Sequence, residues 1–223
     1  YEREEGDHTK FVLDGSNQID DKRTYLDFEQ NPQAINPSWH YVYSANNQPE
    51  EVNEKIYPGY YLPEDRAKRI VTLIESNDAF TGVQVEEMIN DVQSSVSPAL
   101  VKIILDNISK VNLSDTETKA MSILKSWNGA YKKDLVAPTI YYKFIYLLLE
   151  NTFADEMGEE RFEQFLKKHL YKRQIQKTLT LNRSVWWDDI KTKEVKELKD
   201  EIITRSFHMA IEELEKQHGD DVD

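Results

Sequence analysis

Hydrophobic residues recur at spacings of three and four over most of the chain after residue 63, which is the pattern of helices with one buried face. The segment 138–149 is apolar nearly all round, which is typical of a helix inside a core. We predict about seven helices, near residues 64–75, 81–92, 97–108, 114–127, 138–149, 162–170 and 193–217. No internal repeat interrupts the series.

Several of these helices begin with recognisable signals. Pro63 is followed by two acidic residues that favour the positive end of a helix, and Thr81 is a good cap for the second helix. Ser114 and Glu117 have capping-box spacing. In the second helix Val85, Met88, Ile89 and Val92 fall on one face, and in the last helix we expect Ile203, Phe207, Ala210, Ile211 and Leu214 to point inward.

Residues 1–63 have a different character. They hold five of the seven prolines, with short alternating patches at 10–13 and 41–44 between turn signals. We therefore expect a mainly α protein in which a loop-rich segment with a few short strands, residues 1–63, precedes a helical lobe, residues 64–223. The first segment has too few apolar residues for its own core, so it must lie on another surface.

Charge and composition exclude several functions. The chain has 28 basic and 41 acidic residues, a net charge of −13, which disfavours nucleic-acid binding. Its longest apolar run, residues 144–149, is far shorter than the ~20 residues of a membrane span. There is no cysteine for thiol catalysis or zinc-thiolate sites, the five histidines are scattered, and no glycine-rich phosphate loop is present. General motifs alone describe a helical scaffold.

Two patches are more informative, residues 36–49 (NPSWHYVYSANNQP) and 59–70 (GYYLPEDRAKRI). The first has a short extended stretch leading into paired asparagines, and the second places Arg66 in the first turn of a helix. A cation is unfavourable at that positive end, so we expect Arg66 to contact an acidic or carbonyl partner. A plain structural salt bridge is the alternative.

At these residues the chain resembles the penicillin acylase (penicillin amidase) family of N-terminal-nucleophile hydrolases. The resemblance consists of the Asn-Pro, the Ala-Asn-Asn sequence and the Arg-Ala-x-Arg-Ile of the two patches. It continues upstream at 26–32 and downstream at Met88-x-x-Asp91, Leu124-x-x-Trp127-Asn-Gly and the helix around Ala210. The ordered set covers nearly all 223 residues.

The resemblance implies a larger αββα hydrolase of periplasmic or secreted location, acting on the amide bond of N-acyl compounds such as β-lactams. In this family the large subunit begins with a serine nucleophile whose own α-amine is the base. Tyr1 cannot act as that serine, so the chain is expected to be an internal fragment of the large subunit, inactive alone. Its expected partners are the remainder of that subunit, the small subunit and the substrate, without nucleic acid or membrane.

The family pattern also implies two site residues. Asn46 matches the asparagine whose side-chain N–H contributes to the oxyanion hole, and Arg66 matches the arginine that organises charge near the nucleophile, while Asn47 would be structural. Asparagine also suits tight turns, which is the structural alternative for Asn46. The family binds calcium between its subunits, with one ligand a carbonyl near residues 7–12 and no placeable carboxylate in 50–56. We expect no complete metal site in this chain and a possible calcium site in the full protein.

A second hypothesis assigns the chain to a different functional class: a non-enzymatic helical binding or scaffold module. It is motivated by the acidic helical surface and by the missing nucleophile. A catalytically inactive homologue of the acylases is a third.

Overall fold

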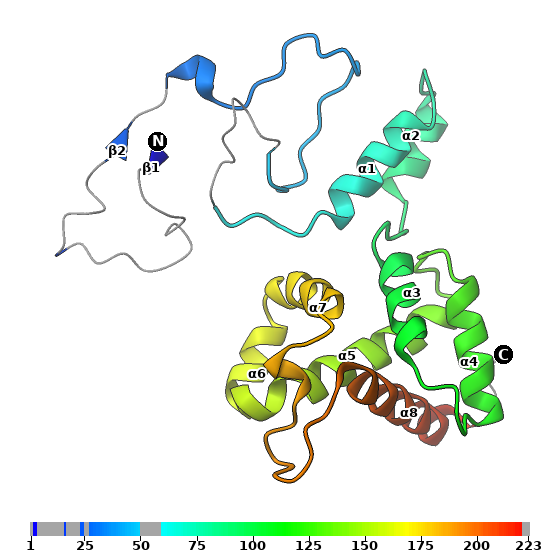
Figure 1. Ribbon diagram of the computed structural model, residues 1–223. Coiled ribbons are helices and arrows are strands. Elements are labelled where there is room, and N and C mark those ends of the chain that lie inside the picture. Colours follow the sequence, from blue (N-terminus) through cyan, green and yellow to red (C-terminus); the bar gives the residue numbers. More distant parts are fainter. Residues whose placement is uncertain (1, 4–15, 17–22, 25–26, 50–58, 220–223) are drawn as a thin grey trace. The chain divides into compact units, whose positions relative to one another are not determined.

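The computed structural model describes residues 2–3, 16, 23–24, 27–49 and 59–219 (Figure 1). The chain divides into two compact units, residues 1–75 and 76–223. Composition and periodicity in the sequence divided the chain differently, into residues 1–63 and 64–223. That division stays a prediction. In the structure the first helix belongs to the N-terminal unit.

The N-terminal unit contains little regular structure. Strand β1 (Glu2–Arg3) pairs antiparallel with β2 (Arg23–Thr24), and a short 3₁₀ helix, η3, spans Phe28–Gln30. Helix α1 (Asp65–Glu75) is its one regular helix longer than a turn among the described residues. The strand predicted at 41–44 is wrong, because these residues form no ladder with another described segment. The strand predicted at 10–13 lies outside the described residues.

The C-terminal unit is helical, which confirms the mainly α prediction. Its helices are α2 (Gly82–Ile89), α3 (Ser97–Asn107), α4 (Asp115–Ser126), α5 (Ala137–Met157), α6 (Glu159–Leu166), α7 (Leu170–Thr180) and α8 (Lys199–His218), with a 3₁₀ turn, η4 (Val185–Trp187), between the last two.

Helix α5 is the centre of this unit, and α4, α6 and α8 pack against it (Figure 1). It is buried on nearly all sides, as its apolar sequence predicted. Its most extensive contact is with α8, where Phe144 meets Phe207 edge to face with ring centroids 6.1 Å apart. Between the same helices the Asn151 amide donates to the Ser206 hydroxyl at 3.0 Å, so these two polar groups are paired.

The capping signals of the sequence are realised in the structure. The Ser114 hydroxyl accepts the backbone N–H of Glu117 at 3.1 Å, while a Glu117 carboxylate oxygen accepts the N–H of Ser114 at 2.8 Å. Thr81 caps α2 in the same reciprocal manner with Gln84. These contacts satisfy backbone donors that a helix leaves free at its start.

Four helix predictions differ from the structure. Helix α5 continues to Met157, beyond the predicted end at 149. The stripe predicted as one helix over 162–170 is split, because α6 ends at Leu166 and a separate helix, α7, begins at Leu170. The last helix begins at Lys199 rather than near 193, after a loop fastened by side-chain hydrogen bonds. On α2, Val85 and Ile89 are exposed and Met88 is only half-buried, so most of the apolar face expected there is not buried among the described residues.

Candidate active site

The loop of residues 36–49 bends at three residues with left-handed backbone conformation. These are Asn36 (φ 48°), His40 (φ 63°) and Asn46 (φ 59°). Asparagine enters this region more readily than most residues, because its short polar side chain can bond locally. At the first bend the His40 N–H donates to the Pro37 carbonyl at 2.9 Å. The backbone also bends at residues 45–46, where Asn46 has its left-handed conformation, and we call residues 44–48 the Asn46 turn.

Two hydrogen bonds join the Asn46 turn to the segment that enters α1. The Leu62 N–H donates to the Asn46 main-chain carbonyl at 2.7 Å, and Arg66 Nη2 donates to Asn46 Oδ1 at 2.9 Å. The partner of Arg66 is thus an amide carbonyl oxygen, one of the two partner types expected from its place at the helix start. The structure brings together the two sequence-predicted site residues, although they are twenty positions apart.

The contact with Arg66 determines which way the Asn46 amide faces. A guanidinium group has only donors, so the atom it holds must be the carbonyl oxygen of the amide. The amide nitrogen, Nδ2, then points away from Arg66 and makes no hydrogen bond with another described residue. Both side chains are exposed in the chain. The arrangement leaves a neutral N–H donor, oriented by a cation, that makes no hydrogen bond to another described residue.

The second asparagine of the pair is used within the loop. Asn47 Oδ1 accepts the Ala45 N–H at 3.2 Å, and Asn47 Nδ2 donates to the Gln48 carbonyl at 3.2 Å. Ala45 itself is buried. These contacts fix the backbone on both sides of Asn46, so the two adjacent amides have different surroundings.

A further contact, for which no sequence pattern is a signal, joins the same loop to the other end of α1. The Tyr41 hydroxyl donates to the Glu75 carboxylate at 2.7 Å. Together with the Arg66 and Leu62 contacts, it attaches the loop at both ends of the helix. Ala67, one position after Arg66, is buried. The orientation of Asn46 therefore depends on α1 as a whole.

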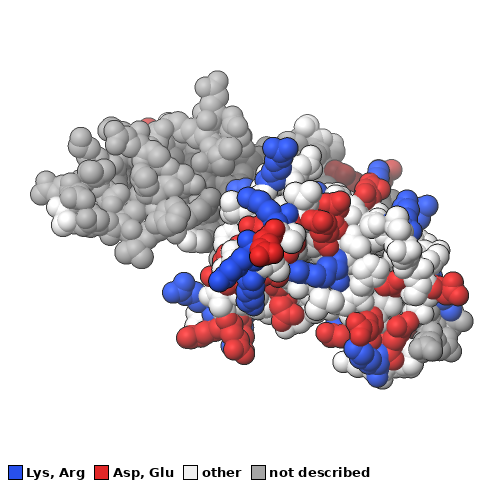
Figure 2. Space-filling view, turned by 60° about the horizontal axis from the view of Figure 1, so that its bottom comes forward, with Lys and Arg blue, Asp and Glu red and all other residues white. Residues whose placement is uncertain are grey.

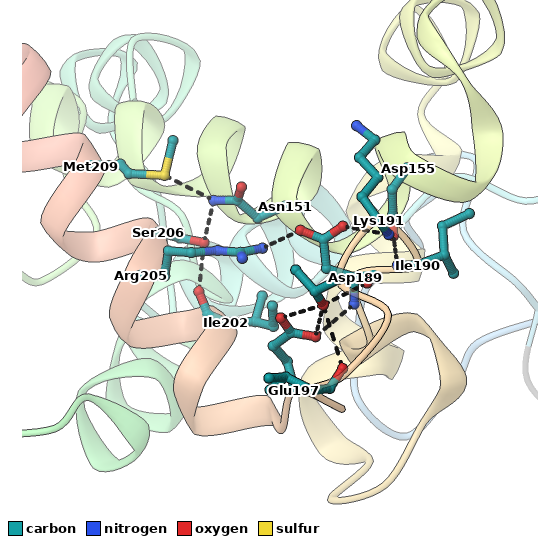
Figure 3. A network of polar contacts seen from close by, with 12 residues as sticks. Asn151, Asp155, Asp189, Ile190, Lys191, Glu197, Ile202, Arg205, Ser206 and Met209 are labelled. Atoms are coloured by element: carbon teal, nitrogen blue, oxygen red, sulfur yellow. Dashed lines mark hydrogen bonds and ion pairs between the residues drawn. The ribbon is translucent and has the colours of Figure 1, made fainter.

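A second polar cluster lies in the C-terminal unit, where the loop of residues 181–198 meets α5 and α8 (Figure 3). Asp155 of α5 accepts the Ile190 N–H at 2.8 Å, and Arg205 of α8 contacts Asp189 at 3.3 Å. Glu197 accepts the Asp189 N–H at 3.1 Å. These contacts hold an irregular loop against two helices, and we assign this cluster to the fold.

Glu156 stands out within this cluster. Burial, followed by the neighbouring carboxyl of Asp155 and a smaller contribution from Asp188, raises the pKa of Glu156 to about 7. One oxygen of each of Glu156 and Asp155 is buried without a hydrogen-bond partner among the described residues. The adjacent acids in the sequence were the only signal for this pair, and sequence reasoning did not single them out.

The described residues were searched for metal-binding clusters and for membrane-spanning helices. Among them no three histidine or acidic side chains gather where a metal ion could bind, and no helix has the length and apolarity to cross a bilayer. The main-chain carbonyl expected near 7–12 as a calcium ligand, and the loop 50–56, lie outside the described residues. The geometry therefore supplies no donor set from which a calcium role could be derived.

Comparison with known proteins agrees with the resemblance noted in the sequence. No protein of curated function matches the chain. A family model described as penicillin amidase matches residues 1–223, which is the whole sequence and includes both the Asn46 turn and all of the helices. The chain therefore belongs to the penicillin amidase family.

Proposed function

We propose that this chain is part of an amidohydrolase that cleaves the amide bond of N-acyl compounds, and that Asn46 donates to the oxyanion. The family match supports hydrolysis of this kind in the whole protein. The observation that carries the assignment of Asn46 is its contact with Arg66, which leaves the amide N–H groups free to donate. An oxyanion hole requires a fixed, neutral donor of this type.

In the proposed reaction, a serine outside this chain attacks the substrate carbonyl after its own α-amine has taken its proton. The carbonyl π electrons move to oxygen, and the resulting O⁻ accepts a hydrogen bond from Asn46 Nδ2. When the tetrahedral intermediate collapses, the C–N bond breaks and the amine leaves with the proton. Water then hydrolyses the acyl-enzyme through a second oxyanion at the same position.

Arg66 is a positioning residue in this scheme, since it acts through Asn46. Its guanidinium holds the amide oxygen, and an amide held at one end cannot turn that oxygen toward a developing negative charge. The positive charge of Arg66 also favours the oxyanion at longer range. Asn47 fixes the backbone of the turn and does not reach the substrate.

The test uses glycine substitutions in the intact hydrolase with a chromogenic N-acyl substrate. Asn46→Gly removes the amide but keeps a residue that tolerates φ 59°. We expect kcat to fall about 10²–10³-fold, or about 2.7–4 kcal/mol, with little change in KM. Asn36→Gly, at another left-handed asparagine, is the matched control and should keep its activity. Unchanged turnover in Asn46→Gly would rule out the oxyanion role, and a wild-type protein that hydrolyses no N-acyl compound would favour the scaffold hypothesis.

A further inference from the structure

A groove with a volume of about 950 Å³ lies between α3 and α4 in the C-terminal unit. This volume is at the upper end of the range for small-molecule sites. Its lining residues belong to these two helices and to the segments that follow them, between Pro98 and Trp127. None of them is part of the Asn46 turn or of α1. The groove is therefore a feature of the helical unit on its own.

The floor of the groove is apolar. Val101, Leu124 and Trp127 are buried in the core and line it from below. Three half-buried side chains pack on the core from one side and face the groove on the other, namely Leu105, Leu113 and Met121. Because such side chains gain by leaving water, the floor favours a ligand with an apolar chain.

The rim of the groove is cationic. Lys102, Lys110 and Lys125 line it, and Asp106 is the one acidic residue among the lining residues. None of the three lysines forms an ion pair with another described residue. On the face drawn in Figure 2, acidic and basic side chains are interspersed. A local excess of positive charge in a chain of net charge −13 indicates an anionic ligand group.

We propose that this groove binds an amphiphilic anion, an apolar chain that ends in a carboxylate. The chain would lie along the floor formed by Leu105, Leu113 and Met121, and the carboxylate would meet the lysine ammonium groups at the rim. Lysine stems are long enough to cover part of the chain while their charged ends stay in water. The inference is independent of the hydrolysis proposed above, because it uses only residues 98–127.

The probe is decanoate, below the concentration at which it forms micelles, titrated into the intact protein by isothermal calorimetry. The variant Lys102→Gln/Lys110→Gln/Lys125→Gln should bind decanoate at least about fivefold more weakly at this site, given the modest contribution of each exposed charge. Lys168→Gln/Lys172→Gln/Lys193→Gln is the matched control, since it removes the same charge from exposed lysines outside the groove. The control should bind decanoate as the wild type does.

Two further arms test the apolar floor. Octanoate, two methylenes shorter, should bind on the order of tenfold more weakly than decanoate. Met121→Glu places a carboxylate in the groove on a helix that tolerates glutamate, and it should abolish the site. Decanoate binding that both triple variants weaken equally, or that Met121→Glu leaves unchanged, would overturn the proposal, as would the absence of saturable binding.

Hydrolysis of an N-acyl substrate, measured in the same rim variant, separates the two proposals. We expect its kcat to be unchanged, because no groove residue belongs to the Asn46 turn. If both triple variants and Met121→Glu still bind decanoate with wild-type affinity, decanoate binds at a different site, which contradicts the proposal that it binds in the groove. Loss of the groove site with normal hydrolysis supports this inference whatever the outcome of the Asn46 test.

Discussion

Glu156 gives the clearest prediction for stability, because its surroundings make the folded protein sensitive to pH near neutrality. Its ordinary pKa of 4.5 is raised to about 7 in the folded state, first by burial and then by Asp155. Between these pH values the folded chain holds a proton that the unfolded chain has lost. The free energy of unfolding therefore decreases as pH rises from about 4.5 to 7.

The size of this effect follows from the two pKa values. A difference from 4.5 to about 7 corresponds to about 3 kcal/mol at most. Glu156 is only half-buried, so we expect solvent to reduce this to about 2 kcal/mol. The variant Glu156→Gln has nearly the same shape but cannot ionise. It should therefore match the wild type near pH 4.5 and exceed it by about 2 kcal/mol at pH 8.

The assay is urea unfolding followed by circular dichroism at several pH values from 4.5 to 8. Glu194→Gln is the matched control, because Glu194 is exposed and lies in the loop of residues 181–198. The control should follow the wild-type curve. Parallel curves for wild type and Glu156→Gln over the whole range would refute the reasoning, since they would mean that Glu156 titrates alike in the folded and unfolded chains.

Two further predictions concern single positions in the helical unit. Gly129 has φ +88°, and an added Cβ would lie 2.4 Å from the Ser94 carbonyl oxygen, so Gly129→Ala should lower the free energy of unfolding by at least about 2 kcal/mol in urea titration. Gly158→Ala, with φ +72° and open space around it, should cost less, and equal losses would contradict the steric argument. Ser114→Ala removes the cap of α4 and should cost about 1 kcal/mol in the same assay, whereas no loss would mean that water replaces the hydroxyl.

The sequence predicted the helices that carry strong local signals. Ser114 with Glu117 identifies the start of α4, and Thr81 identifies the start of α2, because caps act within one turn of the chain. Helix α7 was missed since only Ile175 and Leu179 among its residues are apolar and deeply buried, too few to show a period. Helix α8 begins where a Glu201 carboxylate oxygen accepts the Leu198 N–H at 2.8 Å, a contact that helical periodicity does not encode.

The candidate site was found through family resemblance and a local electrostatic argument. Arg66 at a helix start indicated that it needs a partner, and its partner proved to be the Asn46 amide. The left-handed backbone at Asn46 was consistent with its residue type but not required by it. The contact of Tyr41 with Glu75 could not be predicted, because it joins residues 34 positions apart through one hydroxyl group.

The central claim is that Arg66 acts on catalysis through the Asn46 amide. A double-mutant cycle of kcat/KM for an N-acyl substrate, with Asn46→Ala, Arg66→Ala and the pair in the intact hydrolase, tests it most directly. Residues that act through one another share their losses, so the double variant should retain at least about fivefold more activity than the product of the single effects predicts. Single effects that multiply in the double variant would contradict the account.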